Sequence, residues 1–167
     1  MNSARLMILS IFILFGLMMI PARAQSTADQ IGPVTAEEII DHDRIFRIYV
    51  DRYDPEEEAI EYLSSQEDSL SLYIFFGNWC RESKKYIPGL MKTLKMVDSD
   101  LIEATYIGVD DQKNYPESFL NKFDIEYIPT VVVLKDGFEI GRIEEKPQGS
   151  IEFDLIQIVK RHQGKSD

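Results

Sequence analysis

Cysteine is almost absent from this chain of 167 residues, because Cys80 is the only one. No disulfide can form within the chain, which excludes the disulfide-stabilised scaffolds that many small exported domains use. A lone cysteine in an exported protein indicates an intermolecular disulfide, a reactive thiol or an inert buried residue. The cysteine count alone leaves these three alternatives open.

Basic residues are scarce relative to acidic ones. The chain has 18 Lys and Arg against 29 Asp and Glu, and its formal net charge is −11 at pH 7. Such a chain repels phosphate backbones and anionic lipid surfaces, so we expect no nucleic acid partner. The two histidines, His42 and His162, lie far apart in the sequence without metal-ligand spacing. We therefore expect no metal site, and no motif indicates a cofactor.

A long apolar run occurs near the start of the chain, over residues 6–20. Arg5 precedes it, and Pro21 with Ala22-Arg23-Ala24 follows as an A-x-A cleavage site, which is typical of a secretory signal peptide. The run is shorter than the roughly 20 residues that span a bilayer, so a cleaved signal is favoured over a membrane anchor. We expect a periplasmic or secreted protein after cleavage near Ala24, with membrane contact only if this segment stays uncleaved.

The remaining residues predict one domain of alternating strands and helices. Residues 25–54 are expected to form an N-terminal extension, in which 25–34 is a loose lead-in and Thr35 and Glu38 have the spacing of a helix-capping box. Residues 45–53 fit a helix or a strand, with the helix slightly favoured.

Residues 55–167 are expected to form the main domain. Residues 70–76 are mostly apolar and show no polar alternation, which predicts a strand that is buried on both faces. The other expected elements are a helix that starts at Asp54-Pro55, a helix from Cys80 that Pro88 should kink, a strand over 101–109, a short helix over 116–123, strands over 130–134 and 138–143 joined by an Asp136-Gly137 turn, and a last helix capped by Ser150. This order predicts an α/β fold with a central mixed sheet that helices cover on both faces.

The only cysteine lies where a predicted strand turns into a helix, in the segment Trp79-Cys80-Arg81-Glu82-Ser83. A thiol at a helix N-terminus faces unpaired N–H groups and the positive end of the helix dipole, which both stabilise a thiolate. Arg81 and Lys84 add positive charge nearby, whereas Glu82 opposes them. Cys80 is therefore the candidate nucleophile, and these three charged residues are expected to modulate it.

This segment resembles the W-C-x-x-C active site of the thioredoxin superfamily. Ile128-Pro129-Thr130 is similar to the family's cis-proline segment, Pro88 lies where thioredoxins kink the helix, and Lys135-Asp136-Gly137 resembles the family's hairpin turn. The resemblance covers roughly residues 55–162 and implies a thioredoxin-like fold. It also implies exchange with protein thiols and disulfides or with small thiols, and client binding by Trp79 and by Ile128, Pro129 and Thr130. The W-C-x-x-S form is similar to that of a group of exported bacterial thioredoxin-like proteins.

Two residues depart from the family pattern. Ser83 stands where the second cysteine would be, and a hydroxyl cannot attack a disulfide. We expect it only to donate a hydrogen bond to the Cys80 sulfur. Ile74 stands where the family tends to place a buried acid that takes up a proton during client release. Both departures indicate that dithiol turnover has been lost.

The first hypothesis is an exported monothiol exchange protein in which Cys80 forms a mixed disulfide with a client. The client's own second thiol would resolve this bond by isomerisation, or a small external thiol would resolve it by slow reduction. The alternative is a thioredoxin-fold binding or chaperone-like module that uses the same groove without turnover. A one-cysteine peroxidase is a third interpretation, but no evident group activates peroxide.

Overall fold

A computed structural model describes residues 30–112, 119 and 122–164, so the expected signal segment 1–24 lies outside the described part. The strands are β1 (Gly32–Val34), β2 (Leu70–Phe76), β3 (Ile102–Gly108), β4 (Thr130–Lys135) and β5 (Phe138–Glu144), and the helices are α2 (Ala36–His42), α3 (Arg44–Arg52), α4 (Glu57–Ser64), α5 (Arg81–Val97) and α7 (Ile151–Gln163).

The five strands form one mixed sheet in the order β1-β3-β2-β4-β5. The central strand β2 pairs in parallel with β3 and antiparallel with β4, and β4 continues antiparallel into β5 through the Asp136-Gly137 turn. The predicted mixed sheet and the α/β fold class are confirmed. A strand in the middle of a sheet that is covered on both faces needs apolar residues on both of its sides, which explains why β2 shows no polar alternation.

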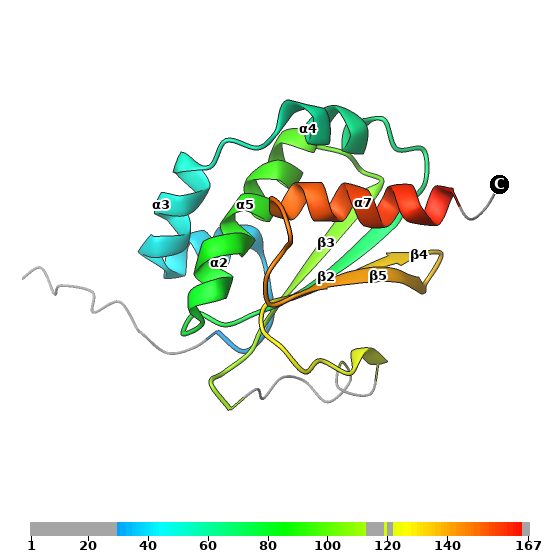
Figure 1. The fold of residues 1–167 in the computed structure, drawn as a ribbon. Coiled ribbons are helices and arrows are strands. Elements are labelled where there is room, and N and C mark those ends of the chain that lie inside the picture. The colour runs from blue at the N-terminus through cyan, green and yellow to red at the C-terminus, as the bar shows by residue number, and fades with distance from the viewer. Residues whose placement is uncertain (1–29, 113–118, 120–121, 165–167) are drawn as a thin grey trace, which may run out of the picture.

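Successive side chains of the strands enter two separate clusters. Leu72, Ile74 and Phe76 of β2 pack under the helices α2 to α5 and α7, and α5 and α7 lie together on this side of the sheet in Figure 1. Phe75 points to the opposite face, where Phe123 and Ile128 cover it. Phe119 and Phe123 are helical. The rest of the predicted helix over 116–123 falls largely outside the described residues.

Several helix boundaries follow the predicted caps. The Thr35 hydroxyl accepts the N–H of Glu38 at 3.2 Å, and the Glu38 carboxylate accepts the N–H of Thr35 at 2.8 Å, which completes the capping box of α2. The Ser150 hydroxyl accepts the N–H of Phe153 at 3.2 Å at the start of α7. The ambiguous residues 45–53 fall largely in helix α3, as favoured. Pro88 lies inside α5, while the kink that it should cause stays a prediction.

The predicted loose lead-in of residues 25–34 is wrong for its last residues. Gly32–Val34 form the edge strand β1, which pairs antiparallel with β3. A Cβ at Gly108 would lie 2.0 Å from the Gln30 carbonyl oxygen, so the lead-in approaches β3 as closely as only glycine allows. Three residues are too few to show a strand period. Phe46 and Val50 of α3 enter the core under β2, so the core continues across residue 55, the expected start of the main domain.

The predicted start of the next helix at Asp54-Pro55 is also wrong. Helix α4 begins at Glu57, and its cap residue Glu56 makes no side-chain capping bond. Instead, the N–H of Glu56 donates to the carboxylate of Glu152 at 3.2 Å, and Pro55 is buried. A contact with a residue 96 positions away therefore decides where this helix begins.

Candidate functional site

The Cys80 side chain lies at the N-terminal end of α5, where Cys80 is the N-cap residue. It is 8% exposed. Together with Phe123 and Ile128, it belongs to the hydrophobic cluster on the face of the sheet opposite to α5 and α7. Its Sγ atom lies 3.3 Å from the carbonyl oxygen of Ile128 and donates a hydrogen bond to it. The fold therefore brings together the two segments that the sequence predicted to form the site: the segment that carries the thiol and the client-binding segment Ile128-Pro129-Thr130.

The peptide bond between Ile128 and Pro129 is cis, as expected. Two hydrogen bonds hold this turn: the Thr130 hydroxyl donates to the Tyr127 carbonyl at 2.8 Å, and the Glu145 N–H donates to the Pro129 carbonyl at 2.7 Å. Thr130 is fully buried and begins β4. Thr130 thus has a role within the turn, which keeps the Ile128 carbonyl next to the thiol, and its contact with a client stays a prediction.

Trp79 lies beside the thiol at the surface. Its indole N–H donates to the Val109 carbonyl at 2.9 Å, and the ring lies directly over Gly77, where a Cβ would come within 2.6 Å of the indole nitrogen. Even so, 41% of the Trp79 side chain remains exposed. Tyr127, which precedes Ile128, is 49% exposed and was not predicted as a site residue, although its place next to the proline segment could have indicated it.

Ser83 differs from its expected role. The side chain is fully buried, and its hydroxyl accepts the N–H of Gly77 at 3.2 Å, whereas the Cys80 thiol is directed to the Ile128 carbonyl. The Cys80 N–H in turn donates to the Gly77 carbonyl at 3.0 Å. Ser83 therefore stabilises the turn that presents Cys80. Ile74 is fully buried in the hydrophobic core between the sheet and the helices. An apolar side chain therefore stands where the family tends to place a buried acid.

The three charged residues expected to modulate the thiol have different surroundings. The Lys84 ammonium lies 3.3 Å from the carboxylate of Asp43, the N-cap residue of α3, and both side chains are partly buried. The negative charge of Asp43 opposes the field that Lys84 exerts at Cys80. Arg81 is exposed and Glu82 is half-buried, and both lie in the first turn of α5. The positive contribution near the thiol is therefore smaller than the sequence indicated.

Asn78, next to Trp79, is a residue that the sequence analysis missed. Both polar atoms of its side chain are buried and have no hydrogen-bond partner within the described part of the chain. An unpaired buried amide costs about 1–3 kcal/mol, so it is rare in a folded domain. No local sequence signal marks it, because its burial depends on tertiary packing.

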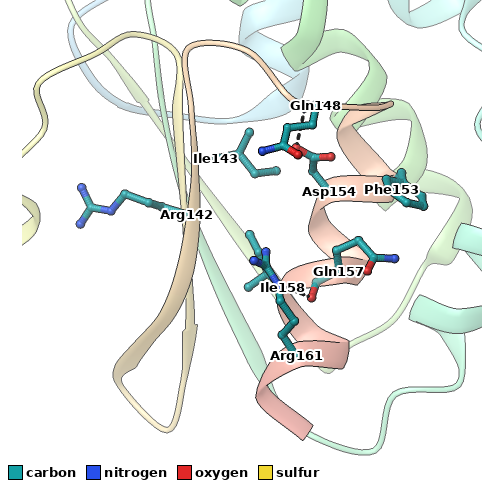
Figure 2. A pocket seen from close by; sticks show the side chains of 8 residues that line it. All are labelled: Arg142, Ile143, Gln148, Phe153, Asp154, Gln157, Ile158 and Arg161. Atoms are coloured by element: carbon teal, nitrogen blue, oxygen red, sulfur yellow. Dashed lines mark hydrogen bonds between the residues drawn. The ribbon is translucent and has the colours of Figure 1, made fainter. Parts of the chain in front are cut away.

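Three further findings concern the described chain outside the surroundings of Cys80. Among residues 30–112, 119 and 122–164, no group of three or more His, Cys, Asp or Glu could hold a metal ion. In the same residues, no helix has both the length and the apolar character needed to cross a membrane. Figure 2 shows a polar pocket between β5 and α7, and none of its lining residues is one of the predicted site residues.

Comparison with known proteins gives a consistent result. A family model described as thioredoxin matches residues 34–157. A thioredoxin of Chlamydia trachomatis is 29% identical over 104 residues, which are 61% of this chain and 91% of the relative.

Solved structures with a similar chain path include a Fasciola hepatica thioredoxin and a Pseudomonas aeruginosa protein of unknown function. The first is 26% identical with a TM-score of 0.42, and the match covers 64% of this chain and 89% of the relative. The second is 19% identical with a TM-score of 0.48, and the match covers 79% of this chain and 78% of the relative.

Proposed function

The chain belongs to the thioredoxin family, which has a general role in thiol–disulfide redox chemistry, and we propose that it acts as an exported monothiol exchange protein through Cys80. The observation that carries the proposal is the contact between the Cys80 sulfur and the Ile128 carbonyl, 3.3 Å apart, at a cis-proline turn. The Ile128 backbone therefore lies beside the reacting sulfur, where we expect an extended client peptide to pair with it as an added strand.

The chemical step is a sulfur exchange. The Cys80 thiol first loses its proton to solvent, and the thiolate attacks one sulfur of a client disulfide. A new bond forms between Cys80 and that sulfur, the client bond breaks, and the second client sulfur leaves as a thiolate. In isomerisation, a different thiolate of the client attacks the client sulfur of the mixed disulfide, which forms a new client disulfide, breaks the bond to Cys80 and leaves the Cys80 thiolate, so that the number of disulfides is unchanged. In reduction, a small external thiol attacks that client sulfur and frees Cys80, and a second external thiol then displaces the first from the client. Two external thiols are thereby oxidised to one disulfide as the client gains two thiols.

Ser83 supports the monothiol interpretation. Its hydroxyl cannot attack a disulfide, and it is occupied by the N–H of Gly77 in a fully buried position. The side chain of Ile74 cannot accept the proton that the family's buried acid takes up during client release. The mixed disulfide should therefore persist until a thiol from outside the chain resolves it.

Export is part of the proposal. The leader-like residues 1–24 with a cleavage site near Ala24 favour a periplasmic or secreted protein. Client disulfides form and persist in such compartments. A site with one thiol suits isomerisation there, because a thiol of the client itself can resolve the mixed disulfide.

The proposal is tested with the signal-free protein and a peptide that contains one disulfide. We expect mass spectrometry of the folded protein to show one peptide chain added through a reducible bond, and Cys80→Ser to abolish the addition. Equilibrium binding of the same peptide, measured with Cys80→Ser, separates the alternative function. Binding that survives in this variant, together with no covalent addition to the wild type, would support the binding module and contradict the exchange protein.

A further inference from the structure

We infer that Arg142, on the edge strand β5, is a positioning residue that fixes the client-binding segment in front of Cys80. The inference rests on the proposed function and assigns to that reaction a residue far from the W-C-x-x-S motif. Arg142 pairs with Val132 of β4 in the sheet. Its side chain points to the chain segment that leads to Ile128. Figure 2 shows its side chain pointing away from the residues of the β5–α7 pocket.

The guanidinium contacts this segment directly. Its Nη2 atom donates to the Phe123 carbonyl at 3.1 Å, and its Nη1 atom reaches the Asp124 carbonyl at 3.5 Å. Phe123 is the last helical residue before the turn, and Asp124 has a left-handed φ of 48°. The last carbonyls of a helix have no partner within the helix, so an arginine that donates to them fixes the point where the chain leaves it.

Glu139 holds the guanidinium in place from the other side. Its two carboxylate oxygens accept hydrogen bonds from Nε at 2.6 Å and from Nη2 at 2.7 Å. This forked pair is geometrically specific, which a lysine cannot reproduce. The hydrogen bonds to Glu139 raise the pKa of Arg142 further above its already high value, so the side chain stays charged. The Glu144 carboxylate, 3.6 Å from Nη1, adds to this.

The segment from Phe123 to Pro129 is thus held at both ends. Arg142 fixes its start, and the Glu145 N–H fixes its end through the Pro129 carbonyl. Ile128 lies between these two points, and its carbonyl accepts the Cys80 thiol. When the start is released, the Ile128 backbone should no longer keep one position relative to the sulfur. The thiol would then be less covered, and an extended client would lose its fixed partner.

The test compares two rates for Cys80 in the full-length mature protein. Iodoacetamide reports access to the thiol without client recognition, and a disulfide-bonded peptide reports exchange that needs the segment. For Arg142→Gln we expect the peptide rate to fall and the iodoacetamide rate to stay or rise, so that their ratio falls by about tenfold, which corresponds to about 1.4 kcal/mol. Arg142→Lys should give an intermediate ratio, because a lysine keeps the charge and loses the fork.

A matched control is Arg161→Gln. Arg161 lies on α7, lines the β5–α7 pocket, and donates to the Gln157 carbonyl within its own helix. Its ratio of rates should equal that of the wild type. The inference would be overturned if Arg142→Gln had the same ratio of peptide rate to iodoacetamide rate as Arg161→Gln. It would also be overturned if both rates of Arg142→Gln fell by the same factor. If Arg142→Gln does not fold, an unchanged ratio in Arg142→Lys overturns it. A wild type that forms no mixed disulfide contradicts the proposed function instead.

Discussion

Replacing Tyr53 by Phe should lower stability at neutral pH and remove part of its loss in alkali. The Tyr53 hydroxyl donates to the Glu152 carboxylate at 2.7 Å, and Glu152 is 1% exposed. The Tyr53 ring also lies against Gly89 of α5, a contact that Phe keeps. A hydrogen bond to a charged group contributes about 1.5–3 kcal/mol, so Tyr53→Phe should reduce the free energy of unfolding by about 2 kcal/mol at pH 7.

The pH dependence follows from the pKa of the same hydroxyl. Burial raises the pKa of Tyr53, and the hydrogen bond to Glu152 and its charge raise it further. In the unfolded chain, the pKa of tyrosine is about 10. The contribution of Tyr53 to stability is therefore complete below that pH. Above it, the unfolded chain releases the proton while the folded protein retains it, so this contribution falls by up to about 1.4 kcal/mol per pH unit.

Urea unfolding between pH 7 and pH 11.5, followed by Trp79 fluorescence and circular dichroism, measures this difference. The curves of the wild type and Tyr53→Phe should lie about 2 kcal/mol apart at pH 7 and converge within about 1.5 pH units above pH 10. Tyr49→Phe is the control, because Tyr49 lies in the last turns of α3, four residues before Tyr53, and is 49% exposed. Tyr106 and its raised pKa, due mainly to burial, are shared by all three proteins. A difference that stays constant up to pH 11.5 would show that the Tyr53 hydroxyl ionises alike in the folded protein and in the unfolded chain.

Two further predictions concern the turn around the thiol. Ser83→Cys should restore a resolving thiol, so the mixed disulfide that accumulates on the wild type should be released without an external thiol; persistence of the adduct in this variant, followed by mass spectrometry, would contradict that. Asn78→Leu should raise the free energy of unfolding by about 1–3 kcal/mol, since it removes an unpaired buried amide at similar volume. Urea unfolding measures this change, and a loss of stability would show that the Asn78 amide has a partner in solution.

The sheet and most helices could be predicted because their signals are local. The mostly apolar residues of β2 predict a central strand, and the side chains of Thr35 and Ser150 cap the helices that follow them. The cis peptide before Pro129 was expected only from the resemblance to a family, since no local pattern distinguishes it from a trans bond.

The missed features depend on contacts between distant residues. Strand β1 exists because the chain near Gln30 lies against Gly108, and α4 starts late because Glu56 donates to Glu152. In the site, the partner of Ser83 and the pairing of Lys84 depend on side-chain directions that spacing does not give. Sequence could therefore identify which segments form the site, but not which hydrogen bonds hold it.

The proposed exchange requires Cys80 to react in the folded protein even though it is 8% exposed. The most direct test is the rate at which Cys80 reacts with glutathione disulfide at pH 7, in the folded mature protein and in the same protein unfolded in urea. A site that presents Cys80 for exchange predicts faster reaction in the folded protein than in the unfolded chain. Slower reaction in the folded protein, as expected for a thiol that is merely buried, would contradict the proposed exchange.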